Sequence, residues 1–94
     1  MSDDPHHRGA LIETAGLQLD RAHLAATTMA GGEVRRGLSL ALIALRDAAR
    51  SATGDDVSLN GIISRLEEAM ANLEAGKLAE MERLIETART DLRA

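Results

Sequence analysis

The sequence predicts an all-α fold, a small bundle of three to four helices with a C-terminal antiparallel helical hairpin. Two observations lead to this prediction. Leu, Ile, Met and Ala residues recur three and four positions apart through most of the chain, which is the spacing of one helix face. Residues typical of strands are scarce, since the chain has no Phe, Tyr or Trp and no stretch alternates apolar and polar residues. Its 94 residues suffice for one domain, which we place at residues 8–94 after a flexible N-terminal tail, residues 1–7.

The first helix is expected from about Arg8 to Met29. Many residues on its apolar face are small, so another helix can approach it closely. This face contains Ile12, Ala15, Leu19, Ala22, Ala26 and Met29. The pair Gly31–Gly32 is expected to end this segment, because glycine readily adopts the left-handed conformation of a helix C-terminus.

The second helix is expected from about Glu33 to Ala52. Its main apolar face comprises Leu38, Ala41, Leu45, Ala48 and Ala52, with Val34, Leu42 and Ala49 beside it. Three further apolar residues, Leu40, Ile43 and Ala44, lie outside this face. A helix that is apolar on more than one side is typically central or contacted on two sides.

Two more helices are expected, at about residues 58–75 and 77–92, after a loop at residues 53–58. The apolar face of the helix at residues 58–75 comprises Leu59, Ile62, Ile63, Leu66, Met70 and Leu73. The apolar face of the helix at residues 77–92 comprises Leu78, Met81, Leu84, Ile85, Ala88 and Leu92. The apolar pattern changes phase at Gly76, which predicts a tight hairpin, although one long helix through Gly76 is the alternative. Leu73–Glu80 and the residues after it resemble the antiparallel hairpins of tetratricopeptide-like repeats, and this resemblance implies helix packing but no function.

No catalytic constellation is expected, and we predict that the protein is not an enzyme and uses no cofactor and no metal. Cysteine is absent, and no serine follows a predicted strand. His23 is the only histidine within a predicted helix. Histidine phosphotransfer domains carry a lysine one turn after their histidine, and Ala26 occupies that place here. A metal site formed by His23 with Asp20 or Glu13 is not favoured, because the chain lacks the Glu-x-x-His motifs of bundle metal centres.

The charge distribution disfavours nucleic acid as a partner. The formal net charge is −4, and the acidic excess lies in the C-terminal half of the chain. A basic strip of Arg35, Arg36, Arg46 and Arg50 keeps a nucleic-acid-associated regulator open as an alternative, but no aromatic residue is present to stack on bases. Pairing of these arginines with Glu or Asp is the simpler expectation. A second alternative is an acidic helical protein that binds or inhibits a basic partner.

A surface for protein–protein interaction is the main functional expectation. Leu17 and Leu24 lie one heptad apart among polar residues, and Leu40 with Ile43 forms a second apolar side on the next helix. A single chain of this size has difficulty covering both, so we expect Leu17, Leu24, Leu40 and Ile43 to bind a partner. The partner is expected to be another copy of the chain, in a homodimer, or another protein. No apolar run is long enough to span a membrane, and no secretory signal is seen, so a cytoplasmic location is expected.

Overall fold

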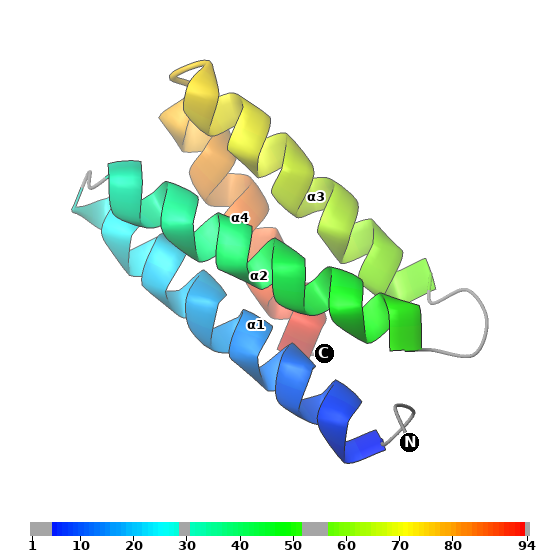
Figure 1. Ribbon diagram of the computed structural model, residues 1–94. Helices are drawn as coiled ribbons and strands as arrows, with labels where there is room; N and C mark the ends of the chain where they lie inside the picture. The colour runs from blue at the N-terminus through cyan, green and yellow to red at the C-terminus, as the bar shows by residue number, and fades with distance from the viewer. Residues whose placement is uncertain (1–4, 29–30, 52–56, 94) are drawn as a thin grey trace.

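Four helices make up the computed structural model, which describes residues 5–28, 31–51 and 57–93. They are α1 (Pro5–Thr27), α2 (Gly31–Ser51), α3 (Val57–Glu74) and α4 (Leu78–Arg93). Each helix contacts the next along the chain, and α4 closes the bundle against α1 (Figure 1). The predicted all-α bundle with a C-terminal helical hairpin is therefore confirmed.

The start of α1 lies earlier in the chain than the sequence pattern indicated. The helix includes Pro5–His7, which we had assigned to the N-terminal tail, while residues 1–4 lie outside the described part. Proline suits the first position of a helix because its fixed φ is helical and the N–H it lacks would have no partner inside the helix. Pro5 is therefore the first residue of α1, whereas the sequence pattern predicts a start at about Arg8.

The end of α1 corrects the role predicted for Gly31–Gly32. Both glycines lie in the first turn of α2, so they do not terminate α1. Two threonines close α1 in their place. The hydroxyl of Thr27 donates to the Leu24 carbonyl at 2.6 Å, and the hydroxyl of Thr28 donates to the Ala25 carbonyl at 3.0 Å. These bonds give additional donors to carbonyl oxygens at the end of the helix.

Gly76 separates α3 from α4, and the alternative of one long helix is wrong. Its φ of 77° is left-handed. The Lys77 amide donates to the Asn72 carbonyl at 2.8 Å, and the Gly76 amide donates to the Leu73 carbonyl at 3.2 Å. This pair of bonds is a Schellman motif, which satisfies the last carbonyls of α3 and turns the chain back.

The core lies between the four helices and is built only from aliphatic side chains and methionine. No polar or charged residue is buried among the described residues. The largest fully buried side chains come from all four helices: Leu19, Val34, Leu38, Leu45, Leu66, Met81 and Ile85. Five alanines of the predicted faces, Ala15, Ala22, Ala41, Ala48 and Ala88, are also fully buried, while Met29 and Ala52 lie outside the described residues.

The helices α1 and α2 approach each other closely at Gly37. A Cβ atom at this position would lie 2.9 Å from Ala22 Cβ and 2.9 Å from the Gln18 carbonyl oxygen. Both distances are shorter than van der Waals contact, and the second involves the backbone. Position 37 therefore requires glycine, and the small residues predicted on the first helix do admit a close neighbour.

Replacing Gly37 by alanine should destabilise the fold, whereas the same change at Gly61 should stabilise it. Gly61 lies in α3 with nothing within 4 Å of a Cβ atom. Gly61→Ala should gain about 0.5–1 kcal/mol from helix propensity. Gly37→Ala has the same propensity gain but forces α1 and α2 apart, and we expect a net loss of about 1–3 kcal/mol. Thermal unfolding followed by circular dichroism measures both. Equal stabilisation by the two changes would show that the close approach imposes no constraint.

Candidate protein interaction surface

The four residues expected to bind a partner are all exposed, on two neighbouring helices. The exposed fractions are 56% for Leu17 and 66% for Leu24 on α1, and 38% for Leu40 and 56% for Ile43 on α2. We call the surface formed by these four side chains the outer face. Leu17 and Leu24 lie opposite the buried Leu19 on their helix, so they point away from the core. The outer face is apolar and belongs entirely to the α1–α2 hairpin.

The contact at Gly37 sets the relative heights of these residues along the bundle. Gly37 packs between Gln18 and Ala22 of α1. Leu40 lies one turn further along α2, and because α1 runs antiparallel, Leu17 is the α1 residue at the same height. Leu17 and Leu40 therefore lie at the middle of the outer face, with Leu24 and Ile43 toward its opposite ends.

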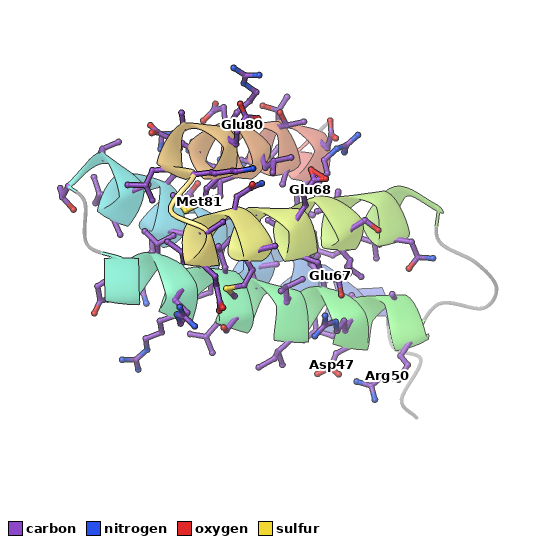
Figure 2. All side chains as sticks on the ribbon, turned by 90° about the horizontal axis from the view of Figure 1, so that it is seen from above. Asp47, Arg50, Glu67, Glu68, Glu80 and Met81 are labelled. Carbon is purple, nitrogen blue, oxygen red and sulfur yellow. The ribbon has the colours of Figure 1, made fainter. Side chains whose placement is uncertain are left out.

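Charged residues surround the outer face. Arg21 and Arg36 lie toward the end near the α1–α2 turn, whereas Glu13 lies one turn before Leu17, toward the other end. Figure 2 shows Asp47 and Arg50, which pair with each other, on the outside of α2. No ion pair is found for Glu13, Arg21 or Arg36 within the described residues.

Three of the four arginines in the predicted basic strip are paired with carboxylates. Arg35 Nη1 lies 2.8 Å from Glu74 Oε1, and Arg46 Nη2 lies 2.6 Å from Glu67 Oε2, so both join α2 to α3. The third, Arg50, pairs with Asp47 one turn earlier on α2. The expectation that arginines of this strip pair with Glu or Asp is confirmed for these three. Their ion pairs occupy guanidinium groups that a phosphate would otherwise bind.

Asp20 links α1 to α4 through two arginines. Its Oδ1 accepts a hydrogen bond from Arg89 Nε at 3.0 Å, and its Oδ2 accepts one from Arg93 Nη2 at 2.6 Å. The hydrogen bond from Arg93 is the largest cause that lowers the pKa of the Asp20 carboxyl below its ordinary value of 3.8. Partial burial opposes this shift, and the hydrogen bond from Arg89 adds to it.

His23 also joins α1 to α4. Its Nε2 lies 3.0 Å from Glu86 Oε2, which also accepts a hydrogen bond from Arg89 at 2.9 Å. The structure therefore pairs His23 with a residue of α4, whereas Asp20, one of the two ligands considered beside it, binds arginines. Over residues 5–28, 31–51 and 57–93, no group of three or more His, Asp or Glu side chains could hold a metal ion.

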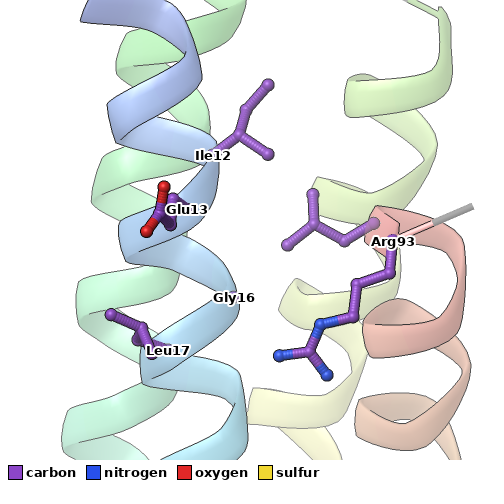
Figure 3. A pocket seen from close by; sticks show the side chains of 6 residues that line it. Ile12, Glu13, Gly16, Leu17 and Arg93 are labelled. Atoms are coloured by element: carbon purple, nitrogen blue, oxygen red, sulfur yellow. The ribbon is translucent and has the colours of Figure 1, made fainter.

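A groove of about 210 Å³ lies between α1 and the end of α4, beside the outer face (Figure 3). It is lined by Ile12, Glu13, Gly16, Leu17, Leu92 and Arg93. A Cβ atom at Gly16 would lie 3.8 Å from Leu92 Cδ2, so α1 and α4 face each other here across a residue without a side chain. The lining of the groove is mainly apolar, and the groove widens the exposed apolar surface on one side of Leu17.

Leu78 is a further exposed apolar residue that the sequence pattern assigned to the core face of the fourth helix. Its exposed fraction is 41%. It begins α4 directly after the turn at Gly76, so it lies at the end of the bundle, where it borders a small cavity with Val34 and Met81. Periodicity predicted correctly that Leu78 lies on the apolar side of α4. It could not show that the bundle ends at this position and leaves the side chain partly uncovered.

Comparisons with protein family models, with curated proteins and with solved structures find no match. Among the described helices, none combines the length and apolar character needed to cross a membrane.

Asp20→Asn should lower the stability of the bundle at neutral pH by about 0.5–1 kcal/mol, because it removes the charge that two arginines contact. Since the folded-state pKa of Asp20 is lowered, its contribution is present above the unfolded pKa and is lost as the pH falls through the folded pKa. The difference between the variant and the wild type should therefore shrink as the pH falls below about 4.

Urea unfolding at pH 7 and at pH 3 measures this difference. Glu80→Gln is the control, since Glu80 points away from the bundle on α4 (Figure 2) and has no ion pair among the described residues. The control should change stability by less than about 0.5 kcal/mol. A difference for Asp20→Asn that stays constant with pH would contradict the electrostatic origin.

Proposed function

We propose that the protein is a non-catalytic assembly module that binds a second copy of itself through the outer face. The observation that carries this proposal is the exposure of four large aliphatic side chains on two adjacent helices. Exposed apolar patches of this kind usually mark interaction surfaces. Covering them would give the chain additional apolar burial, which its core of Leu, Ile, Val, Met and Ala supplies only sparingly.

The shape of the site favours a protein partner over a small molecule. Helix surfaces are convex, and the groove beside Leu17 measures about 210 Å³, below the ~300–1,000 Å³ typical of ligand pockets. A convex apolar surface is well suited to packing against another helix surface, where ridges of side chains fit into grooves.

The alternative functions have weaker support. Arg35 and Arg46 are held by glutamates of α3, so α2 offers few unpaired cations for a nucleic acid. The acidic surface of α3 and α4, which includes Glu68 and Glu80, is open to a basic partner, but acidic surfaces are usually just solvated. Neither alternative accounts for the exposed leucines and isoleucine of the outer face.

Leu40→Glu combined with Ile43→Glu should convert a self-associated wild type into a folded monomer. Both side chains are exposed, so the glutamates meet water in the monomer but would be buried unpaired in the assembly. Light scattering across a concentration series should give the wild type a mass of at least twice 10.0 kDa at high concentration. The double variant should stay at the monomer mass, with unchanged helical circular dichroism.

The control is Ala71→Glu with Ala79→Glu, which adds the same charge at exposed positions on α3 and α4. This control should associate as the wild type does. A wild type that remains monomeric at every concentration would contradict the proposal. Unfolding of the Leu40→Glu, Ile43→Glu variant would also contradict it, because these residues would then be needed within a single chain.

A further inference from the structure

We infer that two copies of the chain pack α2 against α2 in antiparallel orientation, about a two-fold axis that passes between Leu40 and Ile43. This inference rests on the proposed function and adds the orientation of the two copies and the charged residues that select it. In a two-fold interface between identical chains, a contact of residue i with residue j of the other copy is matched by a contact of j with i. The charges on the outside of α2 are arranged in the order that this rule requires.

The outside of α2 presents one stripe of six residues, which we call the α2 stripe. Its members follow one another at spacings of three and four residues in alternation, which is the spacing of helices that pack side by side along their length. At 3.6 residues per turn they fall within an arc of about 80°. This arc lies opposite the buried Leu38 and Leu45. The α2 stripe consists of Glu33, Arg36, Leu40, Ile43, Asp47 and Arg50.

An antiparallel two-fold axis through the midpoint of the α2 stripe brings opposite charges together. Arg36 and Asp47 each lie about 8 Å from the axis along α2, on opposite sides, so Arg36 of one copy faces Asp47 of the other. Glu33 and Arg50 each lie about 13 Å from the axis, so Glu33 faces Arg50 of the other copy. Each contact occurs twice. All four charged residues of the stripe therefore meet a residue of opposite charge.

The same axis brings exposed apolar side chains together at the centre. Leu40 of each copy faces Ile43 of the other, since the two residues lie about 2 Å on either side of the axis along α2. Leu17 of α1 lies at the height of Leu40, because Gly37 packs between Gln18 and Ala22. The rotation lays α1 over α1 as well, so the two copies of Leu17 also lie near the axis. Three of the four apolar residues of the outer face thus gather at the middle of the interface.

The charges of the outer face oppose the other two-fold arrangements of the two copies. If the two α2 helices ran parallel, each residue of the stripe would lie beside its own copy, so Arg36 would meet Arg36 and Asp47 would meet Asp47. An axis that lays α1 of one copy over α2 of the other keeps each residue at its own height and sets Arg36 against Arg21 of the other copy. Like charges in an interface disfavour both arrangements.

The charges of the α2 stripe can take up these contacts without losing an ion pair. Glu33 and Arg36 are exposed, and neither has an ion pair in the described part of the chain. Asp47 pairs with Arg50 of the same chain on the outside of α2 (Figure 2). In the dimer this pair stays intact and lies between Arg36 and Glu33 of the other copy. The four side chains then form a cluster in which positive and negative charges alternate.

Charge reversal tests this orientation. Arg36→Glu alone and Asp47→Arg alone should each weaken self-association on the order of tenfold, since each creates two like-charge contacts in the dimer. An equimolar mixture of the two variants should associate as tightly as the wild type, because both contacts in the mixed dimer then join opposite charges. Glu33→Arg and Arg50→Glu should behave in the same way, alone and mixed, while Arg36 and Asp47 remain in place.

Arg83→Glu and Glu80→Arg are the matched controls, since each reverses one exposed charge on α4, across the bundle from α2, and should leave association unchanged. Sedimentation equilibrium gives the dissociation constants, and circular dichroism checks that each variant is folded. If the single reversals leave association unchanged, or if neither mixture recovers it, while Leu40→Glu with Ile43→Glu abolishes it, the antiparallel orientation is wrong and the assembly through the outer face stands. A monomeric wild type overturns both.

Discussion

The close packing of α1 against α2 at Gly37 is the contact on which the rest of the bundle depends. With no side chain at this position, the backbone of α2 reaches Ala22 and the carbonyl of Gln18. This contact fixes both the separation and the register of the two longest helices. It directs Leu19 inward and leaves Leu17 outside. In a chain without aromatic residues, close helix packing supplies contact that larger side chains would otherwise provide.

The other helix pairs are joined in a different way, since each has an ion pair at its edge. Glutamates of α3 bind arginines of α2, Asp91 of α4 binds Arg65 of α3, and Asp20 of α1 binds two arginines of α4. Exposed pairs of this kind contribute little free energy each, up to about 1 kcal/mol, but they disfavour arrangements that place like charges together. No ion pair among the described residues joins α1 to α2. The outer face of that hairpin consequently contains unpaired charges around an apolar centre.

Helical periodicity was sufficient to predict the bundle and the exposure of Leu17, Leu24, Leu40 and Ile43, because burial repeats with the helix turn. It failed at the helix ends, where hydrogen bonds decide. Threonine hydroxyls, and not Gly31–Gly32, close α1. The turn at Gly76, by contrast, was predicted from the phase change of the apolar pattern, and two amide hydrogen bonds form it. The register of α1 against α2 could not be predicted either. That register is set by a single contact in the folded structure, between Gly37 and the backbone of α1.

The composition of the outer face is not required by the monomer. Glutamate, glutamine and lysine form helices about as well as leucine, and isoleucine is a poorer helix former than any of them. Ile43 therefore contributes little to α2 through propensity, and at 56% exposure it contributes little to the core. The same holds for the packing of Leu24 on α1, since 66% of its surface is exposed. The free energy that these side chains can add is mainly that of apolar surface removed from water, about 25 cal/mol per Å². Within one chain the exposed part of that surface stays in water, so it adds no free energy of burial to the fold.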